Sequence, residues 1–257
     1  MATVRIIGPG RAGSALALAL GAAGWEVEPP YRRGDDLATA AIGVDLLVIA
    51  TPDAAVAEVA AEVTPAPGTV VAHLAGSLGL DVLDPHQHRA SLHPLVSIPR
   101  PDVGSRRLTE GAWFAVAADS PGAERLVGRV VADLNGRAIE VPDEARAAYH
   151  AAACVASNHL VALLAQVERL AAIAGVPLEA YLDLVRGTVD NVEAMGVAAA
   201  LTGPAARGDE ATIARHLAAI PHSERSGYEA MVAEARRLAG HDPASSGTNG
   251  HRGRSGA

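Results

Sequence analysis

Short aliphatic runs alternate with amphipathic stretches through the first half of this chain. Each run has the length and composition of a strand that is buried on both faces of a parallel sheet. The predicted strands span residues 4–8, 25–31, 45–50, 69–74, 111–117 and 138–141. Periodic stretches at 14–23 and 123–134 predict helices, and Gly24 ends the first of them. This alternation predicts an α/β fold with a doubly wound sheet.

The pattern changes near Pro142. Beyond it no strand is indicated, and an alanine-rich stretch keeps helical periodicity over residues 143–174. Further helices are predicted at 178–187, 189–201, 209–219 and 223–239. The sequence therefore predicts a Rossmann dinucleotide-binding domain over 1–141, an all-α substrate and dimerisation domain over 142–240, and a disordered Gly/Ser-rich tail over 241–257.

Composition narrows the classes of function. A net charge of −8 over 257 residues argues against a nucleic-acid partner or an anionic membrane, because both require basic surface. No apolar run approaches the roughly 20 residues that are needed to cross a bilayer. The first strand begins too early for a signal peptide, so we expect a cytoplasmic protein. All 21 basic residues are arginines, which excludes every lysine-dependent mechanism. With one cysteine and no histidine at metal spacing, we expect no metal.

A glycine-rich motif, G-x-G-x-x-G, follows the first strand and opens the first helix. In this position Gly8 allows the tight turn, Gly10 lets a pyrophosphate approach the backbone, and Gly13 lets helix and strand pack closely. Arg11 and Ala12 complete the turn, where the helix N-terminus offers N–H groups to phosphate. The motif predicts dinucleotide binding, and a glycine turn that binds nothing is the alternative.

Cofactor choice is predicted from the end of the second strand. NAD-binding proteins carry an Asp or Glu there, whereas this chain has Arg32 and Arg33. Two guanidinium groups suit the 2′-phosphate of NADP, and Arg11 can add to them. Glu28 and Asp35 are nearby, so NAD stays open as the second choice of cofactor. The alternative is that the arginines belong to a solvated charged turn and bind no cofactor.

Two further positions border the expected cofactor site. Thr51 and Pro52 follow the third strand, where Thr51 can cap a helix with Pro52 at its first position. Because ligands bind beyond the carboxyl ends of such strands, we expect both residues at the cofactor.

Polar residues gather on one side of the long alanine-rich helix. Cys154, Ser157 and Asn158 follow His150 at i+4, i+7 and i+8. A polar stripe on an apolar helix is costly unless it meets partners or a cavity, so it indicates either a site or a satisfied core network. His93 precedes Pro94 after a strand-like stretch, which favours a site position over a surface loop.

Three motifs resemble a known family. They read SLHPL at 91–95, YHAAA at 149–153 with ASN at 156–158, and ALTGP at 200–204 with RGD at 207–209. The chain resembles, over about residues 3–240, the Rossmann-like NADP oxidoreductases whose C-terminal half is the helical domain of unknown function 2520. These are distant relatives of pyrroline-5-carboxylate reductase, ketopantoate reductase and 6-phosphogluconate dehydrogenase. Val96 and Ile98 depart from the family's pattern in the substrate pocket.

The resemblance implies a dinucleotide reductase that forms a homodimer through its helical half. Hydride would pass between NADP and a C=O or C=N group of a small, carboxylated metabolite. We expect His150 to donate or position the proton, with Asn158 orienting the substrate and His93 on the opposite wall.

Further substrate contacts are predicted at Ser157, Asn191 and Arg207. Asn191 is open to a role as a helix cap, and capping by Asp209 alone can explain the motif around Arg207. A ketopantoate-type reductase and a non-catalytic NADP(H) sensor are the alternative functions. Because ketopantoate reductases rely on a lysine and this chain has none, the first alternative is weakened. The sequence leaves the substrate and the direction of reaction open.

Overall fold

The computed structural model describes residues 1–241 and divides the chain into two compact units, Met1–His159 and Leu160–Ala257. Each unit is described by itself. The predicted tail at 241–257 lies, apart from His241, outside the described residues. The boundary between the two units falls after His159, inside the long helical segment, whereas the sequence placed the domain boundary after residue 141. The domain limits of 141 and 240 therefore stay predictions.

The first unit contains one seven-stranded sheet in the order β2-β1-β3-β4-β5-β6-β7. Neighbouring strands are parallel except β5 and β6, which pair antiparallel. The strands are β1 (Thr3–Ile7), β2 (Glu26–Val27), β3 (Leu46–Ile49), β4 (Val70–His73), β5 (Arg89–Pro94), β6 (Trp113–Ala118) and β7 (Arg137–Glu140). The mostly parallel sheet confirms the predicted doubly wound fold.

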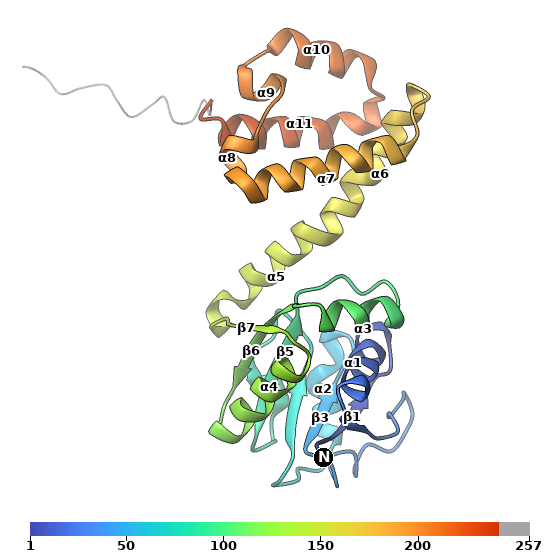
Figure 1. Cartoon of the computed structure of the whole chain (residues 1–257), viewed down its shortest axis with the longest axis vertical. Coiled ribbons are helices and arrows are strands. Elements are labelled where there is room, and N and C mark those ends of the chain that lie inside the picture. The colour runs from blue at the N-terminus through green and yellow to red at the C-terminus, as the bar shows by residue number, and fades with distance from the viewer. Residues whose placement is uncertain (242–257) are drawn as a thin grey trace, which may run out of the picture. The chain divides into compact units, whose positions relative to one another are not determined.

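Each face of the sheet has its own apolar core because neighbouring strand residues point to opposite faces. On β3, Leu46 and Val48 belong to one core, whereas Leu47 and Ile49 belong to the other. The first core is covered by helices α1 (Arg11–Ala22), α3 (Pro101–Thr109) and α4 (Pro121–Asp133), and the second by α2 (Val56–Glu62) (Figure 1). The strand ends that carry the polar motifs are therefore held between two packed layers.

Four elements differ from the prediction. Strand β5 is absent from the predicted strand ranges, where only a strand-like stretch before His93 was noted. The strand predicted over 25–31 is reduced to β2, because Pro29 and Pro30 interrupt it before a single bridge pairs Tyr31 with Ile7. Helix α3 was not predicted, since its sequence PDVGSRRLT has few apolar residues. The helix predicted to start at Pro52 begins instead as the short 3₁₀ turn η1 (Asp53–Ala55), so Thr51 caps nothing.

The long alanine-rich stretch is helical throughout, but it changes type. It consists of η3 (Asp143–Ala145), α5 (Arg146–Cys154), the π-helical turn η4 (Val155–His159) and α6 (Leu160–Ile173). By length and composition alone, the segment Asp143–Ile173 could cross a membrane. A single such helix is weak evidence for a membrane span. It corrects the expectation that no apolar stretch of the chain reaches the length of a span.

The second unit is helical, as predicted. It contains α6, α7 (Leu178–Met195), α8 (Val197–Ala200), α9 (Pro204–Arg207), α10 (Glu210–Ala219) and α11 (His222–Leu238). Arg169 and Glu224 join α6 to α11 by two hydrogen bonds of 2.6 and 3.0 Å. Helix α7 continues through Gly187, where the sequence predicted a stop. Asn191 therefore lies inside a helix, and the prediction that it starts one is wrong.

Candidate active site

The glycine turn has the geometry that phosphate binding needs. Gly8 has a φ of +89°, and a Cβ there would lie 2.9 Å from the carbonyl oxygen of Ala50. A Cβ on Gly13 would lie 2.4 Å from the carbonyl oxygen of Gly8, so only glycine fits between helix and strand. Nothing lies within 4 Å of the equivalent position on Gly10. No side chain caps α1, which leaves its first N–H groups open to an anion.

Exchange of the motif's glycines should separate packing from binding. Gly13→Ala is expected to lower the free energy of unfolding by about 1–3 kcal/mol, because its methyl group meets backbone that cannot move aside. Gly10→Ala is the matched control, since its methyl group enters open space and the folded chain should keep its stability. The same methyl group should weaken dinucleotide binding. Thermal denaturation measures the stability of both variants, and titration measures their dinucleotide affinity. Equal losses of stability in the two variants would contradict the separate roles of Gly10 and Gly13.

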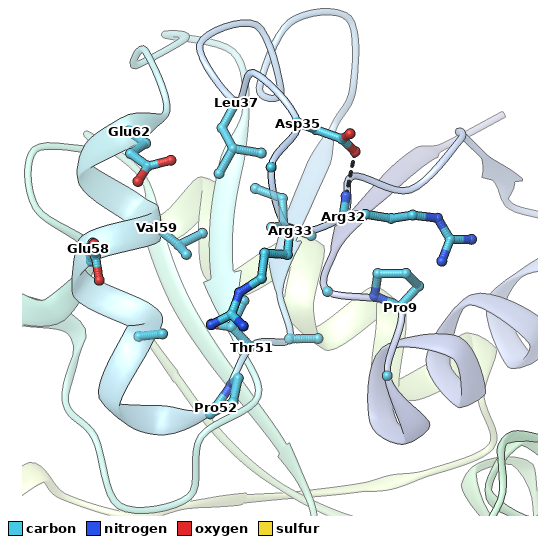
Figure 2. Close-up of a pocket in the computed structure, with 16 residues that line it drawn as sticks. Pro9, Arg32, Arg33, Asp35, Leu37, Thr51, Pro52, Glu58, Val59 and Glu62 are labelled. Atoms are coloured by element: carbon cyan, nitrogen blue, oxygen red, sulfur yellow. Dashed lines mark hydrogen bonds between the residues drawn. The ribbon is translucent and has the colours of Figure 1, made fainter.

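A pocket of about 740 Å³ lies against the glycine turn. It is lined by Gly8, Pro9 and Gly10 of the turn, by Arg32 and Arg33, by Thr51 and Pro52, and by residues of α2. In Figure 2 the Arg33 side chain extends into the middle of the pocket toward Thr51 and Pro52, and Glu58 and Glu62 lie across from it on α2. The predicted cofactor residues of these three segments are thus brought together.

The polar groups of this pocket fit a phosphorylated ligand. Among the residues that the structure describes, neither the Arg32 nor the Arg33 side chain has a hydrogen-bond or ion-pair partner. The Asp35 carboxylate instead accepts a hydrogen bond of 2.6 Å from the backbone N–H of Arg32. Glu28 is held by Arg5 at 3.4 Å and does not line the pocket. The hydroxyl of Thr51 is buried without a partner among the described residues. Two free guanidinium groups and one unused hydroxyl could hold a nucleotide phosphate and ribose.

A second hollow, of about 510 Å³, continues from the first turn of α1. It is lined by Arg11 and Ala12, by residues 96–99 after β5, and by Ser157 and Asn158 of η4. Four of these residues, Val96, Ser97, Ser157 and Asn158, also line a third pocket of about 520 Å³. The hollows therefore adjoin, and the first unit alone links the glycine turn to the polar stripe of the long helix.

The third pocket collects the predicted chemical residues of the first unit. His93 and Pro94 of β5 form one wall, and His150, Cys154, Ser157 and Asn158 lie on the helical wall. The rings of His93 and His150 meet edge to face with centroids 5.7 Å apart. His150 Nε2 lies 3.8 Å from the sulfur of Cys154. The structure thus brings His150, His93, Ser157 and Asn158 together in one pocket, and their chemical roles stay predictions.

The π-helical turn η4 was not predicted, because the residues 155–159 read equally well as α-helix. In it the Ser157 hydroxyl lies 2.8 Å from the carbonyl oxygen of Ala153 and 2.9 Å from Oδ1 of Asn158. Such turns widen a helix locally and recur at functional sites. Here the turn sets Ser157 and Asn158 on both the second hollow and the third pocket.

Tyr149 lines the third pocket, although it is not among the site residues predicted from the sequence. Its hydroxyl lies 2.7 Å from Nδ1 of His93, and the two rings meet edge to face. Burial lowers the pKa of His93 to about 4, and the charges of His150 and Arg146 act in the same direction. Burial also raises the pKa of Tyr149. Both members of the pair are therefore uncharged at neutral pH.

Two other histidines are structural. The fully buried His73 accepts a hydrogen bond at Nδ1 from the N–H of Ala75, so its Nε2–H donates to the carbonyl oxygen of Gly79. Burial lowers its pKa. His86 lies in a loop with a proline before it, a place typical of a solvated side chain, yet its ring is buried and lies 3.0 Å from the carbonyl oxygen of Ala60. Neither residue lines the described pockets.

Two predicted substrate residues lie in the other unit. Asn191 is exposed on α7, and Arg207 is exposed at the end of α9. Asp209 caps α10 by accepting a hydrogen bond from the N–H of Thr212, which confirms its expected capping role. The roles of Asn191 and Arg207 stay predictions.

Comparison with known proteins supports this organisation. A Rossmann-like domain model matches residues 30–99, and the model of the domain of unknown function DUF2520 matches residues 112–235. The second match begins at Ala112, beside β6, so it includes the last two strands of the sheet as well as most of the helical unit. No curated protein matches the chain.

Several solved structures share the fold over nearly their whole length. The "putative NADP oxidoreductase" from Bacteroides fragilis is 22% identical with a TM-score of 0.77, and the alignment covers 92% of this chain and 98% of that one. A reductive aminase from Aspergillus terreus, solved with NADPH, is 18% identical with a TM-score of 0.66, covering 95% and 98%. The pyrroline carboxylate reductase of Plasmodium falciparum, solved with NADP, is 12% identical with a TM-score of 0.60, covering 93% and 98%.

These likenesses establish the fold, and the two domain matches agree with the resemblance found in the sequence motifs. Successive parts of the chain thus match a Rossmann-like domain and the domain of unknown function DUF2520.

Proposed function

We propose that the chain is an NADP-dependent oxidoreductase that transfers hydride between nicotinamide and a C=O or C=N group of a small, carboxylated metabolite. The observation that carries this proposal is the grouping of three hollows in the first unit. One lies against the glycine turn and is lined by Arg32 and Arg33, whose side chains have no partner among the described residues. The other two adjoin one another and lead from the first turn of α1 to His93, Tyr149 and His150. The solved relatives that contain NADP or NADPH support the same cofactor.

The residues at the glycine turn would hold the cofactor. The open N–H groups at Arg11 and Ala12 suit the pyrophosphate, and Arg32 and Arg33 suit the 2′-phosphate. The partnerless hydroxyl of Thr51 suits a ribose oxygen. When bound, the cofactor supplies or accepts the hydride.

The residues of the third pocket would handle the proton. Reduction of a carbonyl needs a proton at the receiving oxygen, and the pocket contains no lysine to provide it. We assign this proton to His150. Asn158 would orient the substrate through its amide, Ser157 would support Asn158, and His93 would form the opposite wall. Arg207 and Asn191, on the helical unit, are our candidates for the substrate's carboxylate.

Single-turnover oxidation of bound NADPH tests the proposed activity. The full-length chain is mixed with NADPH and then with a panel of 2-oxo acids and cyclic imines, and loss of absorbance at 340 nm is followed. Turnover with members of the panel is the expected result. Tight NADPH binding without turnover across the panel would favour the non-catalytic sensor. Preference for ketopantoate within the panel would instead favour the alternative function, a ketopantoate-type reductase, even though the chain has no lysine.

We also propose a homodimer formed through the helical unit. Among the described residues of that unit, only Ala171, Ala205 and Ile213 have buried apolar side chains. Several large apolar side chains of this unit are exposed instead, with exposed fractions of 67% for Val161 and 66% for Leu184. Surface of this kind usually lies at an interface, and twofold dimers are the commonest closed assembly. A dimer would also cover the apolar surface of Asp143–Ile173 without a membrane, in keeping with a cytoplasmic protein.

Light scattering should therefore give the mass of a dimer at tens of micromolar protein. Leu184→Glu is expected to shift the population toward monomer, because a carboxylate would have to be buried at the interface. Leu18→Glu is the matched control, since Leu18 is also exposed but lies on α1 of the other unit. A monomeric unmodified chain at this concentration would refute the proposed dimer.

A further inference from the structure

Arg146 is the most buried charged residue described in the chain. It is the first residue of α5, and only 1% of its side chain is exposed. From sequence, an arginine in the first turn of a helix reads as a solvated residue, and the helix dipole disfavours it there. Burial of a guanidinium group is costly unless charges and hydrogen bonds compensate it fully.

The compensation around Arg146 is incomplete. Its Nε donates to a carboxylate oxygen of Asp143 at 2.8 Å, and its Nη2 donates to the hydroxyl of Ser91 at 2.8 Å. Its Nη1 is buried without a partner among the described residues. The side chain of Asp143 is 64% exposed, so water weakens its attraction for the guanidinium group. Stability alone is therefore a poor explanation for a buried arginine at this position.

The hydrogen bond of Arg146 to β5 lies next to the hydrogen bond that joins Tyr149 and His93 in the pocket. Ser91 and His93 are two residues apart on β5 and point to the same side of the strand. Arg146 and Tyr149 are three residues apart on α5 and share one side of the helix. The hydrogen bond from Arg146 to Ser91 and the one between Tyr149 and His93 are thus two neighbouring connections between the same strand and helix. Together they fix the position of α5, and hence of His150, on β5.

The charge of Arg146 also acts on the ring of His93. Five groups face that ring: Tyr149, His150 and Arg146 from α5, His73 from β4, and Asp53 from the turn after β3. Burial is the strongest influence on the pKa of His93, and it favours the neutral ring. His150, Arg146 and His73 act in the same direction, and only Asp53 opposes them. Of these three, only Arg146 carries a positive charge that does not depend on pH in the accessible range.

We propose that Arg146 is a positioning residue for this pocket, which fixes Tyr149 against His93 and keeps the His93 ring uncharged. His150 is then the ring of the pocket that exchanges a proton with the substrate; this last step rests on the proposed function, whereas the first two do not.

The test follows the titration of His93 in the full-length chain by NMR. The wild-type ring should stay neutral down to about pH 4. In Arg146→Met the titration should move upward toward the ordinary value of 6.5, and the nuclear Overhauser contacts between the Tyr149 and His93 rings should weaken. Arg146→Lys retains the charge and should keep the low titration midpoint. Arg186→Met is the control, because Arg186 forms an exposed ion pair with Asp183 on α7 of the other unit.

The methionine variant should fold, because removal of Arg146 leaves Asp143 in contact with water and no buried charge without a partner. If it does not fold, Arg146→Gln carries the same test with a side chain that still reaches toward Ser91. Wild-type titration of His93 in the folded neutral variant would overturn the proposal. So would a lysine variant that shifts as far as the methionine variant. The measurement needs neither cofactor nor turnover, so it is decided even if the chain proves not to be an oxidoreductase.

Discussion

Replacement of His150 with alanine should lower the rate of substrate reduction by about 10²–10⁴-fold, the usual effect of losing a general acid. NADPH affinity should stay nearly unchanged, because His150 lines the third pocket and not the hollows at the glycine turn. Single-turnover rates and NADPH titration measure the two quantities separately. A histidine is suited to this role because its proton exchanges near neutral pH.

Two variants sharpen this test. His150→Asn keeps a polar side chain that cannot transfer a proton at neutral pH, so it should be as slow as alanine. If asparagine restores the rate, His150 orients the substrate by hydrogen bonding and is not the acid. His159→Ala is the matched control from the same helical segment, since His159 is exposed and does not line the pocket. Comparable losses in the His150 and His159 variants would show that helix stability, not proton transfer, is at stake.

The central strands β3 and β4 could be predicted because they are buried on both faces of the sheet. Runs such as Leu46–Ile49 are apolar without interruption, and few other structures accommodate them at that length. The antiparallel pairing of β5 with β6 could not be predicted in this way, because a continuous apolar run carries no sign of its neighbour's direction. Helix α3 escaped prediction since tertiary packing of Gly104 and Leu108, rather than periodicity, holds it in place.

The candidate site was predictable where local chemistry determines it. The glycines at 8, 10 and 13 have distinct backbone roles that follow from their spacing, and the histidine and amide side chains stand out on an alanine-rich helix. The role of Arg146 depends on burial by β5, which its own sequence neighbours do not reveal. Asn191 was misplaced because Gly187 reads as a helix stop, whereas α7 continues to Met195.

Removal of both arginines from the cofactor pocket should abolish the preference for NADPH. The unmodified chain is expected to bind NADPH more tightly than NADH by about 1–3 kcal/mol, the range for charge-assisted hydrogen bonds to a phosphate. Arg32→Ala/Arg33→Ala should remove most of that difference and leave NADH affinity largely intact, because both side chains lie free of other described partners in a pocket beside the glycine turn. Calorimetry with both cofactors at moderate salt measures it.

The control must separate contact from overall charge. Arg100→Ala/Arg106→Ala removes the same two charges from exposed positions that line none of the described hollows. At moderate salt, charges more than about 10 Å from the ligand are largely screened, so this variant should keep the preference for NADPH. Equal affinities of the unmodified chain for the two cofactors would refute the assignment. A control variant that loses the preference as fully as the pocket variant would show that net charge, and not Arg32 and Arg33, selects the cofactor.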